Sequence, residues 1–485
     1  MTAFGLDIGT SSLKGIALAE DGSVGAKAES SYAFQTPRPG WTEQDPELWW
    51  QAARDVLAEL TRSAGPPAGI GLSGQMHGLV ALDRADRVLR PALLWNDQRT
   101  AAEAAEIEQR MGGVDGLVAA TGNRALTGFT APKLLWMERH EPELHERVAS
   151  VLLPKDYVRL RICGEHATDV TDASGTLWFD VRRRCWSDDV LRTLGVPAEW
   201  LPTARESELV SGITREGIPL AAGAGDQGAG ALGVGAIIGE RSDSDPGQGP
   251  VSIVLGTSGV VCSPLPGYGA DPQGRLQASC HALPDAWFAM GVMLSAAGSL
   301  AWLARATGAS AAELVAEAEL WPPGCEGLLF LPYLTSERSP HHDPGARGAF
   351  VGLSARHERG ALARAVLEGV AFALRDSLDL VRSLGGAVDV ARISGGGARS
   401  ELWLRILASV LGLPLQRPQV EEGAAYGAAL LGGVAGGQWS SAAEAVAACV
   451  TVRATVDPDP VWVAAYEPIR ERFRAVYPAV RPLSD

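Results

Sequence analysis

The chain has 485 residues, 46% of them hydrophobic, which is enough for two or three domains with buried cores. No basic segment offsets its net charge of −15, so we expect neither nucleic acid nor an anionic membrane as a partner. The six cysteines show no CxxC spacing, no basic leader precedes the first strand, and the uncharged stretch 423–437 is too short to span a bilayer. We therefore expect a cytoplasmic protein without a zinc site or a disulfide framework.

The chain opens with a predicted β-hairpin, with strands over residues 3–8 and 13–18. Its turn contains Gly9, Thr10 and Ser11, whose backbone N–H groups and small hydroxyls can hold phosphate oxygens. Asp7, two residues before the turn, could hold a hydrated Mg²⁺ beside them. An ordinary hairpin is the simpler alternative.

Two further strand ends carry polar and aromatic residues. The first follows a helix predicted from Pro46. Here the strand over residues 68–72 runs into Ser-Gly-Gln-Met-His-Gly at 73–78. Open α/β sheets tend to place ligands at such strand ends. His77 could equally be a structural histidine. A strand followed by Trp-Asn-Asp at 95–97 repeats the pattern.

The middle of the chain alternates predicted strands and helices, which indicates an α/β class. It leads to the run 221–230, which is almost all glycine and alanine, with Asp226 as its only charge. Small neighbours let other groups approach this carboxylate closely, as a reactive group on the wall of a narrow cleft requires. A glycine-rich turn in which Asp226 is a turn residue or a helix N-cap is the alternative.

A polar loop over residues 241–250 is predicted to link a first domain, 1–240, to a second domain, 251–485. The second domain starts with another predicted hairpin, whose turn Gly-Thr-Ser-Gly begins at Gly256 and Thr257. Its likeness to the first hairpin predicts an internal duplication. Two such turns could hold one nucleotide between them.

The second half also contains a strand over residues 390–393 that runs into Gly395, Gly396 and Gly397 and then a helix from 401. Free N–H groups and bare glycines make such a segment a suitable nucleotide site. The paired histidines at 341–342 lack a third ligand, which favours a packed loop over a metal site. We predict further helices over 296–307 and 361–384, and two helices over 442–482 with a break near 457–460.

Taken in order, these motifs resemble those of the FGGY carbohydrate kinases over nearly the whole chain. The segments that carry the resemblance are 6–11, 41–46, 73–78, 95–97, 128–136, 152–157, 225–227, 255–259 and 395–400. It implies an α/β fold of two actin-like, ribonuclease-H-like domains around a deep interdomain cleft, with sugar mostly on the first domain and ATP mostly on the second. Gln-Met-His-Gly at 75–78 resembles the branch that phosphorylates the 5-hydroxyl of D-xylulose.

The resemblance also implies roles for single residues. Asp226 would be the general base, and Asp7 and Asp226 would place Mg²⁺. The sugar would be contacted by Met76, His77, Trp95, Asp226 and Gln227. ATP would be held by Gly9, Thr10, Ser11, Lys14, Gly256, Thr257, Gly395, Gly396, Gly397 and Ser400. The small-molecule partners are then D-xylulose and MgATP, and a homodimer is compatible with this assignment.

Three alternatives stay open. A kinase of the same family could act on ribulose, gluconate or glycerol. An actin-like ATPase would hydrolyse ATP without transferring phosphate to a sugar, and the tip at 75–77 argues against it. A silent sugar sensor would have no reason to keep both Asp7 and Asp226 beside intact Gly-Thr-Ser turns.

Overall fold

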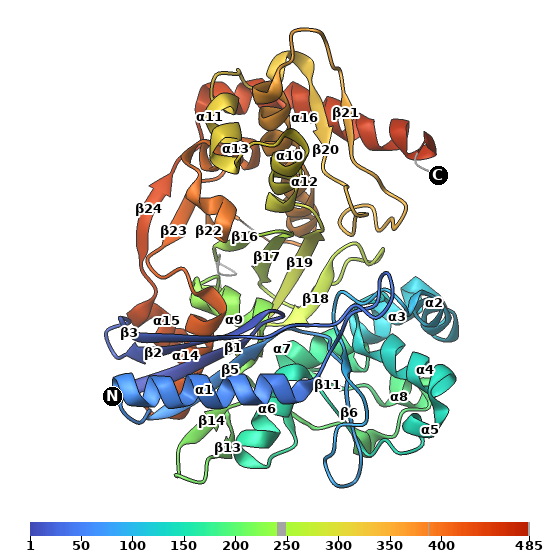
Figure 1. Cartoon of the computed structure of the whole chain (residues 1–485), viewed down its shortest axis with the longest axis vertical. Helices are drawn as coiled ribbons and strands as arrows, with labels where there is room; N and C mark the ends of the chain where they lie inside the picture. Colours follow the sequence, from blue (N-terminus) through green and yellow to red (C-terminus); the bar gives the residue numbers. More distant parts are fainter. Residues whose placement is uncertain (240–248, 387, 484–485) are drawn as a thin grey trace. The chain divides into compact units, whose positions relative to one another are not determined.

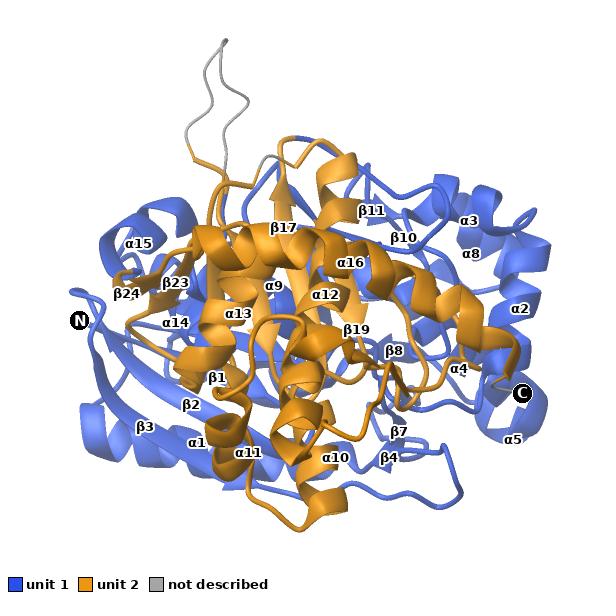
Figure 2. Ribbon diagram, turned by 90° about the horizontal axis from the view of Figure 1, so that it is seen from above, with its two compact units in different colours: residues 1–237, 267–288, 422–450 blue, residues 238–266, 289–421, 451–485 orange. Residues whose placement is uncertain are grey.

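The computed structural model describes residues 1–239, 249–386 and 388–483, and Figure 1 shows their helices and strands. The chain divides into two compact units, coloured separately in Figure 2. Unit 1 comprises residues 1–237, 267–288 and 422–450, and unit 2 comprises residues 238–266, 289–421 and 451–485. Each unit combines a sheet with helices, so the predicted two-domain α/β fold is confirmed.

The units differ from the two contiguous domains that the sequence predicted. Residues 267–288 and 422–450 belong to unit 1, although they lie beyond residue 251. The helix α14 (Gly423–Ala435) explains the second case, because it packs against β1, β5 and α9 of unit 1. A Cβ atom on Gly71 of β5 would lie 1.8 Å from the Ala428 carbonyl oxygen, so only glycine permits this approach. Of the predicted linker, residues 241–248 lie outside the described residues, and the boundary there stays a prediction.

The main sheet of unit 1 has the spatial order β13-β14-β5-β1-β2-β3, and β15 also pairs with β5. Its strands are β1 (Thr2–Ile8), β2 (Ser12–Ala19), β3 (Val24–Ser31), β5 (Gly69–Gly74), β13 (Val210–Ile213), β14 (Pro219–Ala221) and β15 (Ala224–Gly225). β1 and β2 form the predicted antiparallel hairpin, and β1 runs parallel to β5.

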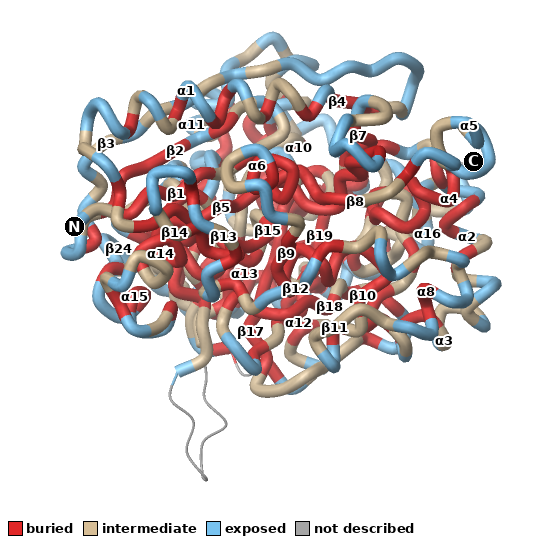
Figure 3. The backbone as a smooth tube through the Cα atoms, turned by 90° about the horizontal axis from the view of Figure 1, so that it is seen from below, coloured by how far each residue is buried: buried red, intermediate tan, exposed pale blue. Residues whose placement is uncertain are grey.

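Two helices cover this sheet on opposite faces. A Cβ atom on Gly15 would meet Val56 of α1 (Pro46–Ala64), whereas one on Gly5 would meet Ala425 of α14. Gly15 pairs with the residue that follows Gly5 in β1, and neighbouring residues of a strand point to opposite faces. The central strands are therefore buried on both sides (Figure 3), which explains their continuous apolar runs.

The remainder of unit 1 consists of short elements. They are β4 (Glu43–Gln44), β6 (Val80–Leu82), β7 (Ala92–Leu93), α2 (Ala101–Arg110), α3 (Val114–Thr121), α4 (Thr130–His140), α5 (Pro142–His145), β8 (Ser150–Leu152), α6 (Pro154–Cys163), β9 (Ala167–Asp169), α7 (Val170–Ala173), η1 (Ser174–Thr176), β10 (Phe179–Asp180), β11 (Cys185–Trp186), α8 (Asp188–Leu194), η2 (Ala198–Trp200), β12 (Thr203–Arg205), α9 (Asp226–Gly233), β18 (Gln277–Cys280) and α15 (Ala442–Cys449).

Unit 2 contains a sheet with the spatial order β19-β17-β16-β22-β23-β24. Its strands are β16 (Val251–Leu255), β17 (Gly259–Leu265), β19 (Trp287–Met293), β22 (Ala391–Ser394), β23 (Leu415–Pro418) and β24 (Val452–Val456). Its other elements are α10 (Ala297–Thr307), α11 (Ala311–Ala318), η3 (Cys325–Gly327), β20 (Leu329–Leu331), β21 (Ala349–Val351), α12 (Arg359–Ser383), η4 (Gly396–Arg399), α13 (Glu401–Leu411), α16 (Pro460–Val480) and η5 (Arg481–Leu483). The predicted second hairpin is formed by β16 and β17.

The prediction for the C-terminal segment is wrong in one respect. The structure has α15 and α16 where two helices were predicted, but β24 lies between them and pairs antiparallel with β23. In β24, Val452, Ala454 and Val456 alternate with polar residues, a pattern that is typical of a strand and that the prediction of two helices did not take into account. It forms because a distant strand offers backbone hydrogen bonds.

Other sequence-based expectations concern single features. His341 stacks on Tyr477, with 3.7 Å between ring centroids, so the paired histidines lie in a packed loop as predicted. All six cysteines lie in the described part of the chain, and none of them forms a disulfide there. Within residues 1–239, 249–386 and 388–483, no helix combines the length and apolar character needed to cross a membrane.

Candidate active site

The two acids singled out in the sequence lie at one edge of the unit 1 sheet. Asp7 of β1 pairs with Ser73 of β5, and Ala224 of β15 pairs with the same serine from the other side. Asp226 follows β15 directly as the first residue of α9. Because all three strands run parallel, Asp7 and Asp226 meet at their carboxyl ends, where α/β folds place ligands. Both acids are half-buried.

The two carboxylates influence each other. Partial burial, and then the negative charge of Asp7, raise the pKa of Asp226 to about 7. Burial also raises the pKa of Asp7, against a hydrogen bond from Ser73 Oγ (2.9 Å) and the positive charge of Lys14. A divalent cation would relieve this repulsion, and Mg²⁺ commonly binds one or two carboxylates together with phosphates and water. The donor set therefore fits Mg²⁺.

Side chains hold the tip of the β1–β2 hairpin in place. Trp95 Nε1 donates to Thr10 Oγ1 at 3.1 Å, and this hydroxyl donates to Gln75 Oε1 at 3.1 Å. Gln44 Nε2 donates to the carbonyl oxygen of Thr10 at 3.0 Å. The indole N–H of Trp95 thus orients the turn, a role that differs from the sugar contact implied by the family resemblance.

Met76 and His77 follow β5 in the chain and are largely buried. A Cβ atom on Gly225 would lie 2.7 Å from Met76 Cγ, so Met76 packs against the residue that precedes Asp226. His77 Nδ1 lies 2.9 Å from the carbonyl oxygen of Gly175, and its ring packs against Phe129. The structural role that the sequence left open for His77 is therefore present, and its contact with a sugar stays a prediction.

Gln227 follows Asp226 on α9 and is also half-buried. Its backbone and side-chain groups form hydrogen bonds with the Asp226 carboxylate that lower the pKa of Asp226, against burial and the charge of Asp7. Gln227 thus favours the charged form of the acid.

Unit 2 contains the second Gly-Thr-Ser turn. The backbone at the start of α10 holds it: Ala296 N–H donates to the Thr257 carbonyl oxygen at 2.8 Å, and Ala297 N–H donates to that of Gly256 at 2.8 Å. Gly298 N–H also donates to Thr257, at 3.1 Å. The turn is therefore rigid, and its geometry depends on backbone groups.

The three glycines after β22 have different surroundings. Gly395 adopts a left-handed φ of 93° and lies against Leu255, as does Gly397. A Cβ atom on Gly396 would meet nothing within 4 Å, so its backbone faces open space. A bare backbone of this kind can receive a flat base or a ribose.

A pocket of about 300 Å³, including its open mouth, adjoins this glycine segment. It is lined by Ile393, Ser394, Gly395, Ala398, Arg399, Arg417, Pro418, Val420, Glu421 and Arg453.

The hydroxyl oxygen of Ser400 accepts the Trp403 N–H at 3.2 Å and caps α13. Its sequence-based assignment to ATP therefore competes with this structural role.

The predicted residues fall into two groups, each within one unit. Unit 1 contains Asp7, Gly9, Thr10, Ser11, Lys14, Met76, His77, Trp95, Asp226 and Gln227. Unit 2 contains Gly256, Thr257, Gly395, Gly396, Gly397 and Ser400.

Sequence reasoning assigned no role to Gln44, Gln75 and Tyr32, all of which hold the first turn. The Tyr32 hydroxyl donates to the carbonyl oxygen of Gly9 at 2.7 Å. Both glutamines lie within segments that carry the family resemblance, 41–46 and 73–78, and this position is the sequence feature that could have identified them.

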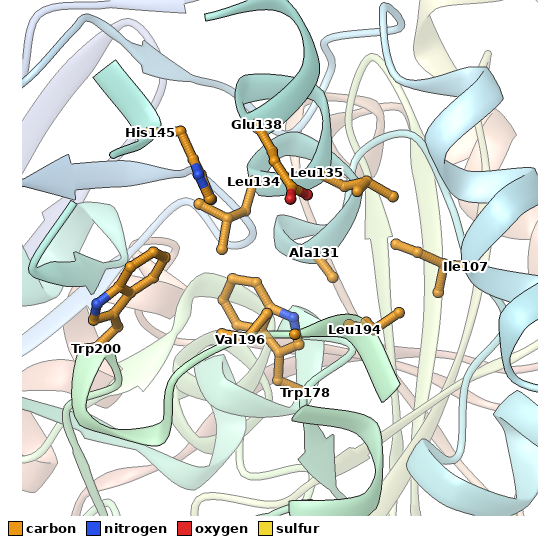
Figure 4. A pocket seen from close by; sticks show the side chains of 11 residues that line it. Ile107, Ala131, Leu134, Leu135, Glu138, His145, Trp178, Leu194, Val196 and Trp200 are labelled. Carbon is orange, nitrogen blue, oxygen red and sulfur yellow. The ribbon is translucent and has the colours of Figure 1, made fainter. Parts of the chain in front are cut away.

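Figure 4 shows another pocket, in unit 1, that includes none of the predicted site residues. Its walls are mainly apolar, and Glu138 and His145 are its titratable side chains. The remaining lining residues are Ile107, Ala131, Leu134, Leu135, Trp178, Leu194, Gly195, Val196 and Trp200.

Comparisons with known proteins identify the family of the chain. The model of the FGGY family of carbohydrate kinases, N-terminal domain, matches residues 2–233, and the C-terminal domain model matches residues 251–436. A xylulose kinase of Escherichia coli (strain K12) is 42% identical over 492 residues, covering 99% of both chains. One from Klebsiella pneumoniae is 40% identical, also covering 99% of both chains. The crystal structure of a xyloylose kinase from Brucella ovis has a TM-score of 0.92 and 39% identity, covering 100% of both chains. The chain thus belongs to the FGGY family of carbohydrate kinases.

Proposed function

We propose that this chain transfers the γ-phosphoryl group of MgATP to the 5-hydroxyl of D-xylulose, giving D-xylulose 5-phosphate and ADP. Family membership supports the reaction class, and the full-length relatives named xylulose kinase support the sugar. The observation that carries the chemistry is the pair Asp7 and Asp226, which the strand register brings to one sheet edge.

In this proposal Asp226 is the general base. Its carboxylate accepts the proton of the sugar hydroxyl while that oxygen forms a bond to the γ-phosphorus. The bond between this phosphorus and the leaving oxygen of ADP breaks as the new bond forms. Burial and the charge of Asp7 raise the pKa of Asp226 to about 7, and Mg²⁺ held by both acids would lower this pKa and keep the carboxylate ionised near neutral pH.

The other residues bind and orient the substrates. Mg²⁺, when held by Asp7 and Asp226, supplies positive charge that offsets the charge of the phosphates. In unit 1, the turn from Gly9 to Ser11 and Lys14 would hold phosphate oxygens. The sugar would lie against Met76, His77, Trp95 and Gln227.

In unit 2, we assign the nucleotide to Gly256, Thr257 and the glycines 395–397. The open backbone at Gly396 supports this assignment, as does the adjoining pocket with its three arginines. Guanidinium groups pair with phosphates and stack on flat rings. Ser400 would contribute through its backbone, since its hydroxyl caps α13.

We also propose a cytoplasmic location and self-association into a homodimer. Sedimentation of the purified chain tests the dimer. A single species with the 50.8 kDa mass of one chain would contradict it.

The decisive experiment is a sugar panel with MgATP, scored by the phosphorylated product. D-xylulose, ribulose, gluconate and glycerol are compared at equal concentrations, with ATP hydrolysis measured in the absence of any sugar. We expect the highest kcat/KM with D-xylulose. A higher value with another substrate would assign the chain to another branch. Hydrolysis unaffected by any sugar would favour the actin-like ATPase.

A further inference from the structure

We infer that Thr171 is a positioning residue for Asp226, linking the backbone next to this acid to a buried cluster of charged side chains. The inference rests on the proposed function, because it takes Asp226 as the base. Thr171 lies in α7 and is fully buried, and none of the segments that carry the family resemblance contains it.

The Thr171 hydroxyl is used in both directions. Its oxygen accepts the N–H of Gly225 at 2.8 Å, and it donates to Asp169 Oδ1 at 2.6 Å. Gly225 is the N-cap of α9 and directly precedes Asp226. Since one partner receives the hydroxyl proton and the other supplies one, the orientation of the hydroxyl is determined.

The remainder of the Thr171 side chain lies against the other side of the same turn. A Cβ atom on Gly228 would lie 3.1 Å from the Cβ and Oγ1 of Thr171 and 3.2 Å from its Cγ2. Thr171 therefore contacts the chain one residue before Asp226 and two residues after it. Movement of the first turn of α9 would break one of these contacts.

Asp169 connects Thr171 to a cluster of buried charges. Besides the hydroxyl, Asp169 Oδ1 accepts the backbone N–H groups of Thr171 (2.7 Å) and Asp172 (3.2 Å). Its other oxygen lies 2.7 Å from Lys155 Nζ, which also contacts Asp156 at 2.5 Å and Asp172 at 3.2 Å. All of these side chains are fully buried.

A second cation of the cluster holds the chain just before Gly225. Arg159 Nη1 donates to the Ala221 carbonyl oxygen at 2.9 Å, and Nη2 donates to that of Ala222. Gly223, which lies between Ala222 and Gly225 in the chain, has a φ of 75°. A Cβ atom on Gly223 would lie 2.1 Å from the Leu72 carbonyl oxygen. The segment that leads to Asp226 is thus held at both ends by one cluster.

The cluster pairs opposite charges. Lys155 and Arg159 supply two positive charges to Asp156, Asp169 and Asp172. Burial raises the pKa of Asp172 well above its ordinary value, against the positive charge of Lys155. Pairing of this kind is what allows charged side chains to stay buried. The cluster forms a rigid support for the hydrogen bond from Thr171 to Gly225.

Such a support matters for catalysis because a displacement of about 1 Å at a reacting group can cost about 10²-fold in rate. A merely structural residue would change the stability of the fold and leave the turnover of folded enzyme unchanged. A positioning residue changes kcat and the ionisation of Asp226 while the enzyme stays folded.

The test compares Thr171→Val, which keeps the shape and removes the hydroxyl, with Thr171→Ser, which keeps the hydroxyl and removes the methyl. We expect kcat of Thr171→Val to fall about 10- to 10²-fold, with the sugar KM within about threefold of wild type. Thr171→Ser should keep kcat within about threefold. The acid limb of the pH profile of kcat/KM should move to lower pH in Thr171→Val, because Asp226 would gain solvent and separate from Asp7.

Thermal unfolding and circular dichroism verify that each variant is folded. If Thr171→Val does not fold, Thr171→Ala takes its place, with the same expected loss of kcat relative to Thr171→Ser. Wild-type kcat and pH profile in the variants without the hydroxyl would overturn the inference. An equal loss in Thr171→Ser would overturn it too, because packing of the methyl would then be responsible.

Asp226→Asn, assayed in parallel, separates this inference from the proposed function. If wild-type enzyme phosphorylates no sugar, or Asp226→Asn turns over normally, both are overturned. If Asp226→Asn is nearly inactive and Thr171→Val behaves as wild type, only the role of Thr171 is overturned.

Discussion

The two Gly-Thr-Ser hairpins have the same architecture in the two units. In each, the first strand runs antiparallel to the second strand and parallel to a later one: β5 for β1, and β22 for β16. The register also agrees. Asp7 pairs with Ser73, which a glycine follows, and Val254 pairs with Ser394, which a glycine also follows. The internal duplication predicted from the turns therefore extends to the strand that flanks each of them.

The hairpins differ in chemistry. The position of Asp7 in β1 is taken by Val254 in β16, so only the first turn has a carboxylate next to it. Side chains such as Gln75 and Trp95 hold the first turn, whereas backbone groups of residues 296–298 hold the second. In the proposed function, the same backbone arrangement takes part in catalysis in unit 1 and in nucleotide binding in unit 2, and the residue at the position of Asp7 is one of the differences between them.

The largest expected effect comes from Asp226, which lies in unit 1 at the same sheet edge as the first hairpin's Asp7. Asp226→Asn keeps the shape and removes the base, so kcat at saturating Mg²⁺ and ATP should fall about 10²- to 10⁴-fold. Steady-state kinetics of product formation measure it. Gln227→Asn is the matched control and should lose far less. Near-normal turnover of Asp226→Asn would refute the assignment.

The second effect concerns Asp7. Asp7→Asn should raise the Mg²⁺ concentration needed for half-maximal turnover by about 10- to 10²-fold, because one of two carboxylates for the cation is lost. Sugar binding without nucleotide, measured by calorimetry, should change little. Ser73→Ala removes only the hydrogen bond to Asp7 and should have a smaller effect. An unaltered response to Mg²⁺ would contradict the role of Asp7.

The converse change tests the second hairpin. Val254→Asp gives β16 the acid that β1 carries, and its charge should repel phosphates and raise the KM for ATP roughly tenfold. Val254→Thr has nearly the same shape without the charge and should behave as wild type. If both variants bind ATP equally well, the second turn does not hold phosphate.

The smallest effect is on stability. The pKa of Asp226 is about 7 in the folded chain against an ordinary 3.8, so the protonated carboxyl stabilises the fold below pH 4. This contribution is lost as the pH rises through 7. The Tm of Asp226→Asn minus that of wild type should therefore be near zero at pH 4 and reach up to a few degrees at pH 8, without ligands. A difference that shrinks over this range would show that burial does not raise the pKa.

Much of the fold could be predicted because the signals are local. Apolar runs on both sides of a glycine turn are sufficient to predict the two hairpins. The long helix predicted over residues 361–384 corresponds to α12, which spans Arg359–Ser383. The order of motifs was also sufficient for the family. The membership of α14 in unit 1 could not be predicted, since it depends on partners far away in the chain. The alternation over Val452–Val456 is a local signal for a strand, but only the fold decides that this strand pairs with β23.

The sequence by itself determined the residue types of the candidate site, including Asp7, Asp226 and the glycine turns, because chemistry and backbone freedom belong to single residues. The tertiary structure alone decided how these residues are held. Asp169 and Thr171 look like ordinary polar residues until folding buries them beside Lys155. Burial then makes each of their contacts obligatory, because a buried charge or N–H group without a partner is costly. That cost depends on neighbours that only the folded chain supplies.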